Sequence, residues 1–96
     1  MALGFYFVNK GFTRDKYEET LRQLDAAGAG APEGRLYHVA LEHEGEIQVF
    51  DIWESQEAMD AFGPVLMPIL AELGVELSPP MVSAVHNVIE GNLAHT

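Results

Sequence analysis

The chain has 96 residues, of which 5 are basic and 15 acidic, so its formal net charge is −10. This length predicts a single domain, and an apolar content of 48% is too high for a disordered chain. The acidic balance argues against nucleic acid and anionic membranes as partners, and the lack of cysteine excludes disulfides, thiolate metal sites and cysteine nucleophiles.

The chain begins with a predicted strand over residues 2–8, which are mainly aromatic and β-branched. This apolar run is too short for a membrane span and has no basic leader, so we expect a cytoplasmic protein. Residues 9–11 predict a turn, and Thr13 predicts the N-cap of a helix over residues 14–27. The apolar stripe expected on that helix consists of Tyr17, Leu21 and Leu24.

A β-hairpin and a second helix follow. The hairpin strands are predicted at residues 35–43 and 46–54, around a two-residue turn that ends in glycine. Ser55 predicts the N-cap of the second helix. Gly63-Pro64 predicts an interruption, after which a new helical piece extends to residue 73.

The last predicted strand covers residues 81–89, and residues 91–96 are predicted to form a flexible tail. The element order is β-α-β-β-α-β, which predicts one ferredoxin-like α+β domain over residues 1–90. Its four-stranded antiparallel sheet would carry both helices on one face. Because the third and fourth strands are apolar on both faces, we expect the uncovered sheet face to pair with a second copy as a homodimer.

The hairpin register predicts a polar pair between the two strands. His38 should face Asp51, and Leu36 should face Trp53. Facing side chains have Cβ atoms about 5 Å apart, so a carboxylate can accept a hydrogen bond from an imidazole N–H. A histidine oriented in this way is the usual form of a general base, because the carboxylate fixes its tautomer. The alternative is that the two residues form a satisfied polar pair with no catalytic role.

The charge distribution and a second histidine, His86, also concern the His38–Asp51 pair. Residues 36–96 contain no Lys or Arg, so Asp51 has no cationic partner in its own part of the chain. His86 is the other polar residue within an apolar strand, and together with His38 and Asp51 it could form a two-histidine, one-carboxylate metal set. The expected strand order separates His86 from the pair, so we predict no metal site.

Two segments carry a family resemblance. Residues 51–62 (DIWESQEAMDAF) resemble the strand-to-helix junction of the dimeric α/β-barrel superfamily, in its antibiotic-biosynthesis-monooxygenase-like branch, where Trp-x-Ser-x-x-Ala is frequent. Residues 86–91 (HNVIEG) resemble the last strand of short members of that branch. The resemblance extends over residues 1–90 and implies the same ferredoxin-like fold and dimer.

This resemblance also implies a class of chemistry. The superfamily includes cofactor-free monooxygenases, polyketide cyclases, isomerases and haem-degrading enzymes. In the cofactor-free reaction the substrate anion itself donates the electron to oxygen, so neither a metal nor a flavin is required. Haem-degrading members use a histidine on the second helix, and residues 55–73 contain none.

The resemblance therefore implies a cofactor-free enzyme acting on an aromatic or polyketide-like molecule. His38 and Asp51 would serve as the base and its orienting group, and His86 or Asn87 would hold a substrate oxygen. The candidate walls of the pocket are Tyr6, Trp53, Phe62 and Leu66. A cyclase or isomerase stays open, as does a non-catalytic ligand-binding protein or a dimer whose cavity is simply core.

Overall fold

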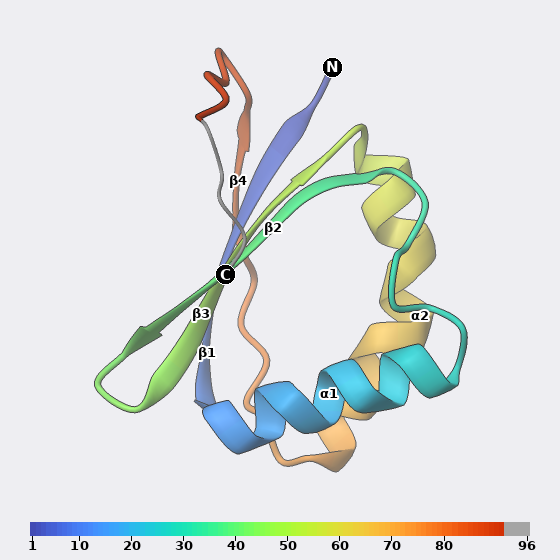
Figure 1. The fold of residues 1–96 in the computed structure, drawn as a ribbon, viewed down its shortest axis with the longest axis vertical. Coiled ribbons are helices and arrows are strands. Elements are labelled where there is room, and N and C mark those ends of the chain that lie inside the picture. Colours follow the sequence, from blue (N-terminus) through green and yellow to red (C-terminus); the bar gives the residue numbers. More distant parts are fainter. Residues whose placement is uncertain (92–96) are drawn as a thin grey trace.

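The computed structural model describes residues 1–91 as a sheet covered on one face by two helices (Figure 1). Its elements in chain order are β1 (Leu3–Thr13), α1 (Arg14–Ala26), β2 (Arg35–His43), β3 (Glu46–Trp53), α2 (Gln56–Glu72) and β4 (Met81–Ala84). The strands are antiparallel in the order β2-β3-β1-β4. The predicted ferredoxin-like arrangement is confirmed, while residues 92–96 of the predicted tail lie outside the described residues.

β1 is longer than predicted. It continues through the expected turn at residues 9–11, and its register with β3 shifts between Val8 and Thr13. Gly11 lies in this irregular stretch with a φ of 77°, so the predicted turn is wrong: its residues form a distortion within the strand. Thr13 caps α1 as predicted, its hydroxyl oxygen accepting a hydrogen bond from the Lys16 N–H at 3.3 Å.

α2 is one helix, so the predicted interruption at Gly63-Pro64 is wrong. Ser55 begins the helix as expected, because its hydroxyl oxygen accepts the Ala58 N–H at 3.1 Å. Proline has no N–H and therefore weakens a helix interior. Here Phe62 and Leu70, on either side of Pro64, are both buried in the core, and this burial holds the two halves of α2 in one element.

The β2–β3 hairpin has the predicted turn. Glu44 and Gly45 have φ values of 51° and 83°, and two consecutive left-handed residues are what a type I′ turn requires. The register beyond the turn follows the prediction over most of its length and places His38 opposite Asp51.

The register changes near the start of β2. Arg35, and not Leu36, faces Trp53, while Tyr37 faces Ile52. The predicted pairing of Leu36 with Trp53 is therefore wrong, because a β-bulge inserts one extra residue between Arg35 and Tyr37.

β4 is shorter than predicted and ends at Ala84. Residues 85–91, here called the C-terminal arm, continue without strand pairing over the sheet face that carries no helices. The arm is tied at two points: the Val85 N–H donates to the Ala2 carbonyl at 3.0 Å, and the Tyr37 hydroxyl donates to the Glu90 carboxylate. The arm thus reaches from the β4 edge of the sheet to the β2 edge.

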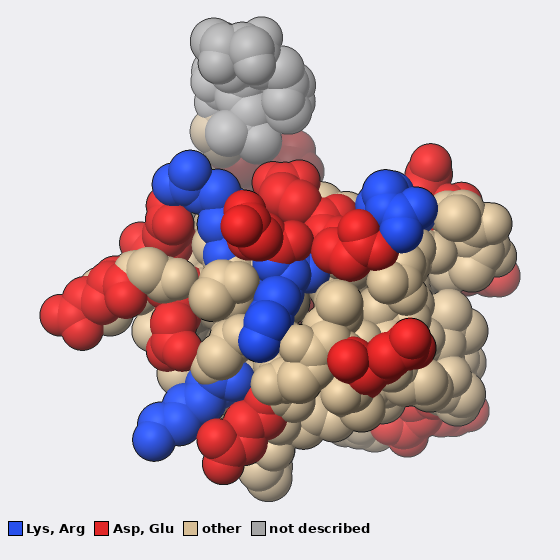
Figure 2. All heavy atoms as spheres, turned by 90° about the horizontal axis from the view of Figure 1, so that it is seen from below, with Lys and Arg blue, Asp and Glu red and all other residues tan. Residues whose placement is uncertain are grey.

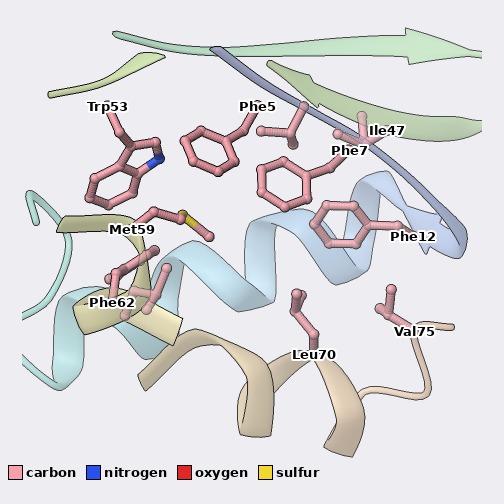
Figure 3. Close-up of a cluster of buried hydrophobic side chains, with 11 residues drawn as sticks. Phe5, Phe7, Phe12, Ile47, Trp53, Met59, Phe62, Leu70 and Val75 are labelled. Carbon is pink, nitrogen blue, oxygen red and sulfur yellow. The ribbon is translucent and has the colours of Figure 1, made fainter. Parts of the chain in front are cut away.

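The hydrophobic core fills the space between the sheet and the helices (Figure 3). Phe5 and Trp53 are its largest fully buried side chains. From the sheet, Phe7, Phe12 and Ile47 also point into this core. From the helical layer they meet Met59, Phe62 and Leu70 of α2 and Val75, which follows α2. Within residues 1–91, no helix has the length and apolar character needed to cross a membrane.

Candidate functional site

A cavity of about 90 Å³ lies between the sheet and the two helices. Its walls are mostly apolar and come from all the helices, from β1, β2 and β3, and from the segment before β4. The predicted wall residues Phe62 and Leu66 both line it, together with Phe7, Phe12, Met67 and Leu70. A small group of polar side chains also faces this cavity, which is the usual composition of a ligand site.

Three of these polar side chains form a continuous hydrogen-bonded chain. His38 Nδ1 lies 2.6 Å from Asp51 Oδ1, and His38 Nε2 lies 2.7 Å from the Tyr17 hydroxyl oxygen. The Tyr17 and His38 rings are parallel within 1°, with centroids 6.0 Å apart. The pair expected from the hairpin register is therefore present, and α1 adds a third member.

The direction of each hydrogen bond follows from the chemistry of the groups. An ionised carboxylate can only accept, so His38 donates from Nδ1 to Asp51. A neutral imidazole with its proton on Nδ1 presents Nε2 as an acceptor, and the Tyr17 hydroxyl therefore donates to it. Both ring nitrogens of His38 are therefore engaged, Nδ1 by Asp51 and Nε2 by Tyr17.

Asp51 is the buried end of the chain, with 5% of its surface exposed. Its second oxygen, Oδ2, accepts a hydrogen bond from the Trp53 indole N–H at 3.3 Å. Trp53 was predicted as a wall of the pocket, and the structure places it behind the site, where it contacts Asp51 and packs against Phe62 with ring centroids 5.5 Å apart. Both oxygens of this buried carboxylate are thus satisfied without Lys or Arg.

Tyr17 is the site residue that the sequence pattern missed. It lies on the apolar stripe of α1 and was assigned to the core for that reason. Burial raises the pKa of the Tyr17 hydroxyl, the charges of Glu18 and Asp51 act in the same direction, and the charge of Arg35 opposes them. A tyrosine packed against the core needs a partner for its hydroxyl, and this requirement was the available signal.

Asn9 is a second residue that was missed, because its segment was predicted to be a turn. It is buried at the cavity wall, and its side-chain oxygen accepts the Ser78 N–H at 2.9 Å. That contact fixes the side chain at the cavity wall.

The remaining predicted residues are on the opposite side of the sheet. Tyr6, His86 and Asn87 line a groove of about 400 Å³ between the open sheet face and the C-terminal arm. Tyr6 alternates in direction with the core residues Phe5 and Phe7, and His86 follows the end of β4. The structure therefore does not bring His86 together with His38 and Asp51, and no cluster of three potential metal ligands occurs within residues 1–91.

Comparisons with known proteins agree with this architecture. No protein-family model matches the sequence, and no curated protein matches it. Among solved structures, SnoaB, a cofactor-independent oxygenase from Streptomyces nogalater, has a TM-score of 0.60 at 14% identity, covering 94% of this chain and 96% of that chain.

Two further solved structures are similar in the same way. A candidate antibiotic biosynthesis monooxygenase from Chloroflexus aurantiacus has a TM-score of 0.61 at 18% identity, covering 93% of this chain and 95% of that chain. Another from Deinococcus radiodurans has a TM-score of 0.53 at 15% identity, covering 99% and 100%. The chain therefore has the ferredoxin-like fold of antibiotic-biosynthesis-monooxygenase-like proteins.

Proposed function

We propose that this protein is a cofactor-free enzyme that deprotonates an aromatic or enolic substrate and lets the resulting anion react with oxygen. The observation that carries the proposal is the chain from Asp51 through His38 to Tyr17, which ends at an apolar cavity. The description of the similar SnoaB as a cofactor-independent oxygenase supports this choice of chemistry.

The proposed proton path runs along these hydrogen bonds. A substrate hydroxyl or activated C–H gives its proton to Tyr17 as Tyr17 passes its own proton to His38 Nε2. Asp51 then faces an imidazolium and stabilises it at 2.6 Å. Because the pKa of Tyr17 is raised, its hydroxyl is protonated at neutral pH and acts as a relay, and His38 is the group that holds the proton.

The oxidation that follows balances without a cofactor. A substrate CH₂ group beside the aromatic ring loses two C–H bonds and four electrons and becomes a carbonyl. One molecule of O₂ accepts those electrons; one oxygen atom enters the new carbonyl, and the other leaves as water with the two protons. The chain's own residues contribute the removal and return of protons and a mostly apolar cavity.

The size of the cavity restricts the substrate. An apolar cavity of about 150 Å³ admits benzene in an engineered protein core. The present cavity is about 90 Å³, which is smaller, so even one ring requires its walls to move outward to some extent. A polycyclic, polyketide-like substrate requires a much larger movement of α1 and α2 away from the sheet, which favours a single-ring substrate.

Replacement of Tyr17 by Phe tests the proton path. The change removes only the hydroxyl, so we expect oxygen consumption with a single-ring substrate that carries an activated CH₂ group, such as 4-hydroxyphenylacetone, to fall by at least about 10-fold. The matched control is Tyr37→Phe, because Tyr37 bonds to Glu90 on the other sheet face. An oxygen electrode, corrected for autoxidation in buffer, measures both.

Two results would contradict the proposal. The first is that the wild-type protein does not accelerate oxygen consumption by 4-hydroxyphenylacetone or by the tricyclic anthrone above the buffer rate, which would favour a non-catalytic binding protein. The second is that Tyr17→Phe and Tyr37→Phe have equal rates, which would remove Tyr17 from the proton path.

We further propose that the open sheet face joins two copies of the chain. A row of large side chains crosses all four strands on this face, from Val39 through Phe50 and Tyr6 to Met81. Several residues of the face are well exposed, including Val8, Val39, Leu41 and Met81. An exposed apolar face of this extent is typical of an interface.

Native mass spectrometry tests this interface. We expect a mass of two chains for the wild type and of one chain for Leu41→Glu, because the added charge would be buried without a partner. Val65→Glu makes the same change at an exposed position of α2 and should stay dimeric. A monomeric wild-type protein would exclude the proposed interface.

A further inference from the structure

The β-bulge at the start of β2 changes the direction of Arg35. Had the predicted register continued, Leu36 would face Trp53 on the helix-covered side of the sheet, and Arg35 would point to the open side. The extra residue instead places Arg35 opposite Trp53 and leaves Leu36 53% exposed. The bulge thus turns the charged Arg35 side chain toward the interior and the apolar Leu36 side chain toward solvent. β-Bulges that redirect a side chain in this way are frequent beside active sites.

Arg35 reaches the cavity as a result. It lines the cavity together with His38, and the two occupy consecutive helix-facing positions of β2. Its charge also acts on the Tyr17 hydroxyl. Arg35 therefore lies at the same polar end of the cavity as the proposed proton path.

The guanidinium of Arg35 retains hydrogen-bonding capacity. It donates one hydrogen bond, to the Gly30 carbonyl at 3.3 Å. Arg14 and Arg22 are paired with Glu42 and Glu19, whereas no carboxylate of residues 1–91 lies within 4.0 Å of Arg35. The one carboxylate that lines the cavity, Asp51, already accepts from His38 and Trp53.

Because the molecule as a whole is strongly negative, an unpaired positive charge at the cavity indicates a specific role. The chain carries a formal net charge of −10, and on the face shown in Figure 2 the basic side chains are mixed with acidic ones. Such a surface repels anions over its general area. A cation that is half-buried at an apolar cavity, without an acidic partner, is the kind of group that binds a specific anion.

We propose that the cavity binds a single-ring aromatic carboxylate, with Arg35 pairing with the carboxylate and the ring lying between the apolar walls. The inference rests on the proposed function, because the ring hydroxyl of such a ligand would lie toward Tyr17, the residue proposed to receive its proton. A planar guanidinium can donate hydrogen bonds to both oxygens of a carboxylate, and the opposite charges strengthen these bonds. A neutral amide of the same shape lacks the negative charge and binds the guanidinium less strongly.

A pair of matched probes tests the proposal by isothermal titration calorimetry. 3-Hydroxybenzoate and 3-hydroxybenzamide have nearly the same shape, carry both polar groups on one side of the ring and differ in charge at neutral pH. We expect the wild-type protein to bind the carboxylate at least about 10-fold more tightly than the amide, the usual scale for a hydrogen bond to a charged group. Arg35→Gln should abolish this preference.

Arg22→Gln is the control, because it removes the same charge from an exposed residue of α1 and should leave the preference unchanged. Should Arg35→Gln fail to fold, Arg35→Lys keeps the charge but loses the two-point contact and is expected to lower the preference several-fold. The proposal is overturned if the wild type binds neither probe or shows no preference, or if the folded Arg35 variant keeps the full preference.

The binding measurement separates this inference from the proposed function. A protein that discriminates the carboxylate through Arg35 but consumes no oxygen with any phenol would retain the anion site and lose the oxygenase activity. A protein that consumes oxygen with neutral phenols but shows no preference for the carboxylate would retain the activity and lose the anion site.

Discussion

Replacement of His38 by Gln is expected to slow oxygen consumption by about 10²–10⁴-fold while the protein stays folded. Glutamine has a similar length and can still donate a hydrogen bond to Asp51, so that buried carboxylate keeps a partner. It cannot hold a proton at neutral pH, and the path from Tyr17 therefore ends without an acceptor. The effect should appear in kcat, because ligand contacts with the apolar walls and Arg35 are unchanged.

His43→Gln is the matched control for this variant. His43 lies at the tip of the β2–β3 hairpin, largely exposed and away from the cavity. We expect its rate to equal that of the wild type. A His38→Gln protein that keeps full activity would show that the His38–Asp51 pair is structural, and circular dichroism with thermal unfolding would separate loss of chemistry from loss of fold.

Replacement of Trp53 by Ala is expected to lower the free energy of unfolding by about 3–5 kcal/mol. Trp53 has 0% of its surface exposed and packs against Phe62, so its removal leaves a cavity in the middle of the core. It also removes one of the two hydrogen bonds to the Asp51 carboxylate. Domains of 96 residues are stable by only about 5–14 kcal/mol, so this loss is a large part of the total.

Trp53→Phe separates the two contributions. Phenylalanine keeps most of the ring contact but lacks the indole N–H, so we expect a smaller loss of about 1–3 kcal/mol from the unmade hydrogen bond to a buried carboxylate. Urea unfolding measures all three proteins at one concentration, so that association of chains does not enter the comparison. Equal losses for Trp53→Ala and Trp53→Phe would contradict a major role for packing at this position.

These expected effects follow from the position of the site between two layers. Asp51 and His38 come from the sheet, and Tyr17 comes from a helix packed on it, so the proton path exists only while the helix covers the sheet. Trp53 belongs to both systems, since its ring is in the core and its N–H is bonded to the site. Stability and function are therefore expected to decline together when this region is loosened.

Several features were determined by the sequence alone because they depend on neighbouring residues. The type I′ turn at Glu44-Gly45 sets which residues of β2 and β3 face each other, and it places His38 opposite Asp51. Thr13 and Ser55 begin the two helices through hydrogen bonds to backbone N–H groups three residues ahead. The order of the elements then left the ferredoxin-like arrangement as the natural fold.

The tertiary structure decided the rest, because those features depend on contacts between distant segments. Alternating side chains do not reveal which face of a sheet the helices will cover, so the placement of Tyr6 and His86 on the face opposite His38 was not predictable. α2 continues through Pro64 because its residues Phe62 and Leu70 are buried in the core, and this burial outweighs the low helix propensity of proline. The meeting of Tyr17 with His38 and the bulge that turns Arg35 inward arise only when α1, β2 and β3 pack together.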